Sequence, residues 1–253
     1  MKDLLEVRGL TRRFGGLTAI SEISFGVSEG EIFGVIGPNG AGKTTLFNVI
    51  AGQFVPSAGR VMLAGVDVSG HSSDEIGRRG VARTFQGVHV FSKATVEENL
   101  RRAAVLARCH HPLVYRPRAL RGDDGAAALD VATFVGLRDV LDEVAGSLPY
   151  GLQKLLGIGM ALMSSPKLLL MDEPAAGLNP SEKLAARSLI RKMRDETGIT
   201  ILLVEHDMPL VMGVCDRILV INHGKRLALG IPDTVKADES VIDAYLGEDY
   251  EFA

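Results

Sequence analysis

The sequence is poor in cysteine, in net charge and in long hydrophobic runs, and each shortage excludes a class of protein. Its two cysteines, Cys109 and Cys215, are far apart and lack the spacing of metal ligands, which favours buried or incidental thiols in a reducing compartment. A net charge of −3 gives no global electrostatic basis for binding nucleic acid. The apolar run at 155–163 is about half of the roughly 18 residues that a membrane-spanning helix needs.

The start of the chain and its length bear on localisation and domain organisation. No signal peptide precedes the alternating, strand-like pattern that opens the sequence. A chain of 253 residues can bury a sizeable core in one domain with a sub-domain. We therefore expect one domain over residues 1–253, in the cytoplasm, with any membrane association made through a partner.

A glycine-rich segment at 37–45 is the strongest signal in the chain. It consists of Gly37, Pro38, Asn39, Gly40, Ala41, Gly42, Lys43, Thr44 and Thr45. The pattern Gly, any four, Gly-Lys-Thr lets backbone N–H groups surround a phosphate chain; Lys43 reaches the β- and γ-phosphates and the Thr44 hydroxyl is a ligand for Mg²⁺. An apolar strand pattern precedes the segment and a helical pattern follows it, so that a helix N-terminus points at the phosphate. This context argues against a glycine-rich turn with an incidental lysine, and it predicts binding of a nucleoside triphosphate.

Two further strand patterns end in groups that suit phosphate chemistry. Four apolar residues at 168–171 predict a buried parallel strand that delivers Asp172 and Glu173 to its carboxyl end, where ligands bind in such sheets. Asp172 would serve the Mg²⁺ that bridges the phosphates, and Glu173 would accept a proton from the attacking water or polarise it. A second strand at 200–204 leads to His206, whose imidazole can donate to a γ-phosphate oxygen. The alternatives are a strand that ends in an acidic turn and a structural histidine.

The remaining patterns predict an α/β protein. Strands are expected at 4–7, 23–27, 60–64, 81–86, 167–171, 200–204, 217–221 and 226–228, and helices at 126–135, 139–144, 182–196, 208–214 and 240–246. Another helix begins at Thr95, which forms a capping box with Glu98. The alternation of strands and helices after residue 165 predicts a parallel sheet covered on both faces. His110 and His111 lie in an irregular stretch with no carboxylate or cysteine cluster beside them, so we expect solvent exposure and not metal binding.

Taken in order along the chain, these motifs resemble the nucleotide-binding subunit of ATP-binding-cassette (ABC) transporters. The resemblance implies a P-loop cassette with a parallel core sheet, a small antiparallel sub-domain and a helical sub-domain at approximately 92–163. It implies ATP and Mg²⁺ as ligands, with Lys43, Glu173 and the switch histidine His206 in catalysis. Phe14 would carry the adenine ring, and Gln86 would touch Mg²⁺ or the attacking water while its loop meets the membrane subunit.

One motif departs from the family pattern. In the family, the usual signature Leu-Ser-Gly-Gly-Gln faces the γ-phosphate bound by the opposite protomer. Residues 148–153 of this chain have Leu-Pro-Tyr-Gly-Leu-Gln at that place. The residues expected to contact the nucleotide are Pro149, Tyr150, Gly151 and Gln153. Pro149 offers neither a hydroxyl nor an N–H, and losing one charge-assisted hydrogen bond of about 1.5–3 kcal/mol would weaken ATP-driven closure about ten- to a hundred-fold. Gly151 keeps its N–H and the following helix keeps its dipole. The proline is either a variant accepted in one branch or the mark of a degenerate signature that leaves one strong and one weak site. In the loop that joins two cassettes, Asn179 also replaces the usual aspartate.

Softer signals concern the transported solute and the partners. Arg-Arg-Phe-Gly-Gly at 12–16, Ala-Arg-Thr-Phe-Gln at 82–86 and the tail at 244–248 are similar to the branch for branched-chain amino acid uptake and to related systems for urea and short amides. The resemblance implies a second cassette, identical or paralogous, permease subunits contacted through the Gln86 loop, and indirectly a solute-binding protein outside the membrane. Two rivals are a non-transport cassette that acts on DNA or ribosomes and a scaffold that binds ATP without useful turnover.

Overall fold

The computed structural model describes residues 3–110 and 124–245, with the side chains of 108–110 excepted. His110, which we expected in the irregular stretch, is the last residue of helix α3 (Val96–His110). His111, the rest of that stretch and the tail beyond Tyr245 lie outside the described residues, as do the side chains of Cys109 and His110.

Among these residues, six strands form the central sheet in the order β10-β9-β3-β8-β7-β6. They are β3 (Ile32–Ile36), β6 (Val81–Arg83), β7 (Leu168–Asp172), β8 (Thr200–Val204), β9 (Arg217–Asn222) and β10 (Lys225–Gly230). Neighbours from β9 to β6 are parallel, and β10 pairs antiparallel with β9. The expected parallel sheet is thus present, with an antiparallel strand at one edge.

The inner strands of the sheet are buried on both faces, to which successive side chains of a strand point in alternation. In β7, Leu169 and Met171 join a core cluster with the helices that follow β6, whereas Leu168 and Leu170 join a second cluster with helix α1 (Lys43–Ile50). All five residues of β3, of β7 and of β8 are buried. A run of apolar residues without alternation is what a strand covered on both faces requires.

The second cluster is covered by an antiparallel sheet in the order β2-β1-β4-β5. Its strands are β1 (Asp3–Phe14), β2 (Leu17–Ser28), β4 (Ala58–Leu63) and β5 (Val66–Asp67), and a short helix, α2 (Ser73–Gly77), follows them. β1 and β2 are longer than the strands expected from the sequence, since they continue to the hairpin that joins Phe14 to Leu17.

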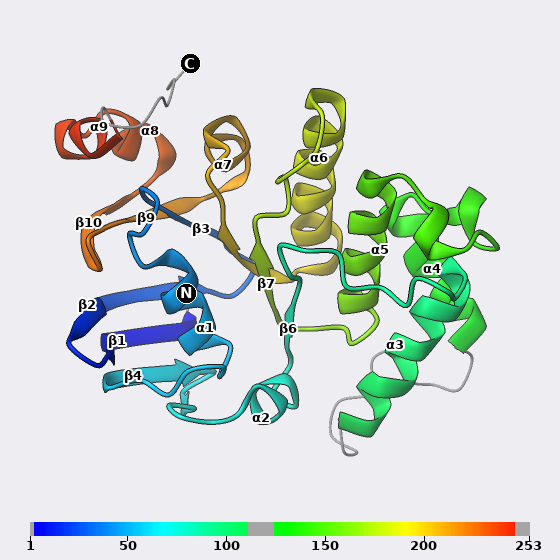
Figure 1. Ribbon diagram of the computed structural model, residues 1–253, viewed down its shortest axis with the longest axis horizontal. Coiled ribbons are helices and arrows are strands. Elements are labelled where there is room, and N and C mark those ends of the chain that lie inside the picture. The colour runs from blue at the N-terminus through cyan, green and yellow to red at the C-terminus, as the bar shows by residue number, and fades with distance from the viewer. Residues whose placement is uncertain (1–2, 111–123, 246–253) are drawn as a thin grey trace.

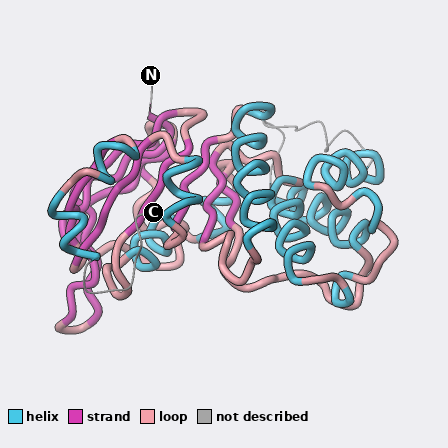
Figure 2. Tube along the Cα trace, turned by 90° about the horizontal axis from the view of Figure 1, so that it is seen from above, coloured by secondary structure: helices cyan, strands magenta, loops and turns pink. Residues whose placement is uncertain are grey.

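The first cluster is covered by helices. Between β6 and β7 the described elements are α3 (Val96–His110), α4 (Asp124–Val135), the 3-10 turns η2 (Arg138–Val140) and η3 (Ala145–Ser147), and α5 (Tyr150–Leu162). The later helices are α6 (Pro180–Thr197), α7 (Met208–Val214), α8 (Pro232–Lys236) and α9 (Glu239–Tyr245). Figures 1 and 2 both show α3, α4 and α5 gathered at one end of the molecule, and β1, β2 and β4 at the other.

Two expectations about local structure are wrong. The strand expected at 81–86 ends at Arg83, so Gln86 lies in a loop. The helix expected at 139–144 is only the turn η2, because the backbone that follows is used to cap α3: the carbonyl oxygens of Leu141 and Glu143 accept hydrogen bonds from the N–H groups of Glu97 and Val96. Free N–H groups in the first turn of a helix need such acceptors. The capping box between Thr95 and Glu98 is present as expected.

Candidate nucleotide-binding site

Three neighbouring parallel strands end at one edge of the central sheet, and each end carries a predicted group. β3 leads into the loop at 37–42, β7 ends at Asp172 and Glu173, and β8 leads to His206. Parallel strands present their carboxyl ends on the same side, which is why motifs distant in sequence meet here.

Two glycines of the loop at 37–42 lie where an added Cβ would clash with the backbone. A Cβ at Gly37 would lie 2.0 Å from the carbonyl oxygen of Ile221, and one at Gly42 would lie 2.6 Å from that of Ala19. Lys43 folds back over the loop, and its Nζ donates to the carbonyl oxygens of Gly37 and of Pro38, the latter at 2.9 Å. The N-cap of α1, Gly42, makes no side-chain hydrogen bond, and a helix N-terminus of this kind favours an anion.

A pocket of about 520 Å³ lies next to this loop. Its volume falls within the range of about 300–1,000 Å³ that small-molecule sites occupy. The lining consists of Phe14, Leu17, Thr18, Ala19, residues 39–45, Glu173, His223 and Gly224. The structure therefore brings the predicted aromatic residue, the phosphate loop with Thr44 and Thr45, and the predicted carboxylate of Glu173 around one space.

The ring of Phe14 is held in place by two neighbours. The guanidinium of Arg12 lies 4.5 Å from the ring centroid, and Phe54 packs against the ring in an edge-on arrangement with centroids 5.3 Å apart. Phe14 is still 39% exposed. A preoriented, exposed aromatic face at the end of the pocket is suited to stacking on a nucleobase.

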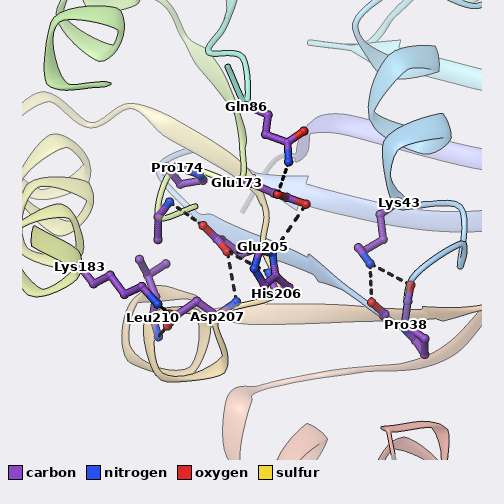
Figure 3. A network of polar contacts seen from close by, with 12 residues as sticks. Pro38, Lys43, Gln86, Glu173, Pro174, Lys183, Glu205, His206, Asp207 and Leu210 are labelled. Carbon is purple, nitrogen blue, oxygen red and sulfur yellow. Dashed lines mark hydrogen bonds and ion pairs between the residues drawn. The ribbon is translucent and has the colours of Figure 1, made fainter. Parts of the chain in front are cut away.

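Glu173 is the centre of a polar cluster with Gln86 and His206 (Figure 3). Gln86 Nε2 donates to Glu173 Oε2 at 2.6 Å, and His206 Nδ1 lies 3.7 Å from Glu173 Oε1. The Glu173 backbone has φ of +46°, a left-handed conformation that costs a non-glycine residue on the order of 1–3 kcal/mol. Strain of this kind persists only where the surroundings impose it, so the position of this carboxylate is built into the fold.

A buried glutamate that sequence reasoning missed organises the turn after Glu173. Glu205 is 1% exposed, and its carboxylate accepts hydrogen bonds from the backbone N–H groups of Ala175, His206 and Asp207. Burial raises the pKa of Glu205, while these hydrogen bonds act in the opposite direction. From the Glu-His-Asp sequence at 205–207 only His206 was predicted to be functional, because the local sequence does not show that the Glu205 side chain points into the core.

Asp172 is paired with Arg83, another residue that sequence reasoning missed. Arg83 Nη2 donates to Asp172 Oδ2 at 2.8 Å, and Nη1 donates to Asn48 on α1. Burial raises the pKa of Asp172, and the Arg83 guanidinium opposes that rise. The two side chains are 13% and 11% exposed, so the pair is largely withdrawn from water.

The segment at 149–153 does not join this pocket. Pro149 is the N-cap of α5, Gln153 Nε2 donates to the Leu148 carbonyl oxygen at 2.8 Å, and neither lines the space around the phosphate loop. Tyr150 packs against Gly177, where an added Cβ would lie 2.9 Å from the ring, and Gly151 lies against Glu182 of α6. Within one chain the segment is therefore separate from the phosphate loop.

The turn between β9 and β10 also contributes to the pocket, which was not predicted from the sequence. Gly224 N–H donates to the Ala41 carbonyl oxygen at 2.9 Å, and both His223 and Gly224 have positive φ. The Asn-His-Gly sequence between two short strands was the available signal for a tight hairpin.

The residues around the pocket fit a nucleoside triphosphate with Mg²⁺. The loop offers backbone N–H groups, Lys43 a cation and Thr44 a hydroxyl, which are groups that phosphate and a hard divalent cation take. Asp172 does not line the pocket itself; its carboxylate lies at the end of β7, next to Glu173 in sequence, and is paired with Arg83. Together with the strand order, this pocket defines a P-loop nucleotide-binding protein.

Comparisons with known proteins carry the classification further. The family model described as "ABC transporter" matches residues 20–176, and one described as "Branched-chain amino acid ATP-binding cassette transporter" matches residues 225–251. The chain is 42% identical to the high-affinity branched-chain amino acid transport ATP-binding proteins BraF of Pseudomonas aeruginosa and LivG of Escherichia coli, over 98% of this chain and 99% of each relative. Among solved structures, the ADP conformation of an ATP-binding cassette of an ABC transporter superposes with a TM-score of 0.87 at 30% identity, covering 98% of this chain and all of the other.

The chain belongs to the ABC transporter family, as one of its ATP-binding, ATP-hydrolysing subunits. The fold class predicted from the sequence is confirmed, and so is the family resemblance. Proteins of this class bind adenine nucleotides, dimerise and work with permease subunits. In the part of the chain that the structure describes, no helix is both long and apolar enough to cross a membrane.

Proposed function

We propose that this subunit energises the uptake of branched-chain amino acids. The support is kinship: the relatives that share 42% of their residues over nearly the whole chain carry that name, and the second family model matches the C-terminal residues. The observation that carries the ATPase part of the proposal is the pocket that joins Phe14, the phosphate loop and Glu173. We further propose that residues 1–253 act as one nucleotide-binding domain whose helical part spans approximately 92–163.

In this proposal the phosphate loop binds the nucleotide, and residues at the ends of the strands take part in its hydrolysis. The amides of 37–45 and Lys43 hold the phosphates, and Thr44 with Asp172 and Gln86 serves Mg²⁺, which supplies charge neutralisation when it is bound. Phe14 stacks on the adenine, and Arg12 fixes the ring that does so. Phosphoryl transfer asks the protein for positioning and charge stabilisation, and these groups provide both.

Glu173 is proposed as the group that orients the attacking water and accepts its proton. Gln86 and His206 already contact its carboxylate from two sides, so three groups that come from different loops converge on one point. His206, whose side chain is 45% exposed, would donate to a γ-phosphate oxygen and thereby report that the nucleotide is uncleaved.

The second half of each site is proposed to come from a second cassette, identical or paralogous. The N-terminus of α5, which carries Pro149, Tyr150, Gly151 and Gln153, would face the γ-phosphate bound by the partner. Asn179 would lie near the contact between the two cassettes. Its side-chain oxygen is already used as the N-cap of α6, where it accepts from the Glu182 N–H at 3.0 Å.

The permease is proposed to dock on a groove beside the Gln86 loop. This groove has a volume of about 380 Å³ and lies between the loop after β6 and helices α3 and α5, with lining residues that include Phe85, His89, Leu106 and Met160. Docking here would hold the protein at the cytoplasmic face of the membrane and connect permease movement to Gln86. A solute-binding protein on the other side would act only through the permease.

The test is ATP-induced dimerisation, followed by light scattering on the wild type and on Glu173→Gln. The variant should bind ATP without cleaving it and form a dimer that disappears when ATP is removed, whereas Lys43→Ala should stay monomeric. A Glu173→Gln variant that hydrolyses ATP at the wild-type rate would refute the proposed role of Glu173. For the solute, the complex reconstituted with its permease should accumulate leucine and not urea.

Pro149 favours one second candidate, an ATP-binding scaffold without useful turnover. This candidate predicts that the complete complex binds ATP, yet hydrolyses it no faster when solute is supplied. Solute-stimulated hydrolysis by the same complex would exclude it.

A further inference from the structure

A buried lysine connects helix α5 to the backbone beside Glu173. Lys154 is 9% exposed, and its Nζ donates to the carbonyl oxygen of Glu173 at 2.9 Å and to that of Pro174 at 3.3 Å. The Tyr150 ring lies alongside, with its centroid 5.5 Å from the same nitrogen. The lysine thus crosses from the helical part of the chain to the end of β7.

The peptide that Lys154 contacts is the one held in a strained conformation. Glu173 has φ of +46°, its N–H donates to the Val204 carbonyl oxygen, and its own carbonyl oxygen also accepts from the Ala176 N–H at 3.1 Å. The turn is therefore fixed from the sheet side by β8 and from the helical side by Lys154. Loss of either contact leaves a left-handed residue with less to hold it there.

Retaining a cation at this position has an energetic cost. Burial lowers the pKa of Lys154, and the nearby carboxylates of Glu205 and Glu173 act against that change. An apolar side chain could fill the same volume without that cost, so what the ammonium group adds is its directed hydrogen bonds to two carbonyl oxygens.

We infer that Lys154 is a positioning residue, which sets the orientation of Glu173 and makes it depend on where α5 lies. The inference rests on the role of Glu173 proposed above. Lys154 is one turn into the helix whose N-terminus carries the 149–153 segment. A shift of α5, caused by contact with a partner's nucleotide or by the permease at the adjoining groove, is transmitted to the Glu173 peptide through this lysine.

The chain offers a matched control. Lys192 on α6 donates from Nζ to the Phe134 carbonyl oxygen at 3.1 Å and lies 4.3 Å from the Phe134 ring centroid. Like Lys154 it donates to a backbone carbonyl oxygen of another element, here from α6 to α4, and it does not line the pocket. Lys192→Met therefore reports the general effect of removing such a bond.

The first measurement is amide hydrogen exchange over 173–177 in the full-length, nucleotide-free protein. Lys154→Met should accelerate exchange in this segment about ten- to a hundred-fold, the factor that one charge-assisted hydrogen bond represents. Lys154→Arg, which can still donate to both carbonyl oxygens, should restore most of the protection, and Lys192→Met should leave the segment unchanged. Unchanged exchange in Lys154→Met overturns the inference, as does equal acceleration in Lys192→Met.

The second measurement separates kcat from ATP binding. Lys154→Met should lower kcat by about tenfold or more, while the Kd for ATP, measured in the Glu173→Gln background, changes by less than about twofold, because the Lys154 side chain does not line the nucleotide pocket. The Glu173→Gln variant tells the two possible failures apart. If Glu173→Gln is inactive and Lys154→Met keeps the wild-type kcat, the inference about Lys154 is overturned. If Glu173→Gln is fully active, the role proposed for Glu173 is wrong, and the exchange measurement alone decides whether Lys154 positions the turn.

Discussion

Replacing Arg83 by methionine should expose how strongly the Asp172 carboxylate depends on its partner. The two side chains are 13% and 11% exposed, and their contact is 2.8 Å long. Removing one partner of a buried ion pair leaves an uncompensated charge and destabilises a protein by about 3–5 kcal/mol. Arg83 also donates to Asn48 and lies over the Phe47 ring, 4.8 Å from its centroid, so we expect a loss of about 3 kcal/mol or more.

The assay is urea denaturation of the nucleotide-free protein without Mg²⁺, on Arg83→Met, Asp172→Asn and the double variant. Because the amide introduced by Asp172→Asn carries no charge, the double variant should be more stable than the sum of the single effects predicts, with a coupling of about 2 kcal/mol or more. Arg78→Met is the control: its ion pair with Asp74 has side chains that are 52% and 42% exposed, and its loss should cost less than about 1 kcal/mol.

The dependence on pH gives a second check on the same reasoning. Burial raises the pKa of Asp172 and Arg83 opposes the rise, so the pKa should be higher still in Arg83→Met. The destabilising species is the ionised carboxylate. The stability deficit of the variant should therefore be full at high pH and shrink as the pH falls and Asp172 takes up a proton. Additive single effects, or a deficit that grows at low pH, would refute the account of this pair.

Three further outcomes are expected. Gly42→Ala should lose ATP binding in a fluorescence titration and about 1–3 kcal/mol of stability, because its Cβ would lie 2.6 Å from the Ala19 carbonyl oxygen. Gly136→Ala is the control: this glycine is also left-handed, but nothing lies near an added Cβ, so the variant should keep ATP binding. Pro149→Ser should strengthen the ATP-dependent dimer of the hydrolysis-deficient variant about ten- to a hundred-fold in a light-scattering dilution series, and an unchanged midpoint would show that backbone amides suffice. Burial lowers the pKa of Lys154 in the folded protein below the ordinary 10.5 of the unfolded chain. Between the folded and the unfolded pKa the unfolded chain binds more protons, so the stability of the wild type relative to Lys154→Met should rise with pH in that range. A stability difference in urea denaturation that does not change with pH would contradict this.

The parts of the fold that could be read from the sequence are those encoded by local pattern. The strand at 200–204 and the helix at 208–214 were predicted with the bounds that the structure has, because an unbroken apolar run and a periodic one leave little choice of element. The meeting of the phosphate loop with Glu173, and the approach of His206 to Glu173, followed from one rule, that parallel strands end at one edge.

What could not be read are contacts whose two ends are far apart in the chain. Arg83 and Lys154 stand in sequences that look like an ordinary strand end and an ordinary helix, and only the packing of α5 and β6 against β7 turns them toward Asp172 and the Glu173 peptide. The failure at 139–144 has the same origin. Its local pattern favours a helix, yet the carbonyl oxygens there are used by the first turn of α3, so a tertiary demand overrides the propensity.

The hydrogen bonds that α5 makes within its own chain also help to explain the altered signature at 148–153. In α5 the side chains of Gln153 and Lys154 both donate to backbone carbonyl oxygens of their own chain, at Leu148 and at Glu173. Pro149 as the N-cap provides no side-chain hydrogen bond. In the dimer proposed above, the helix would offer its first-turn amides and its dipole to the partner's phosphate, and neither depends on the missing serine. The loss of the hydroxyl is a loss of one contact and not of the site, and for this reason we expect the Glu173→Gln variant to dimerise with ATP despite Pro149.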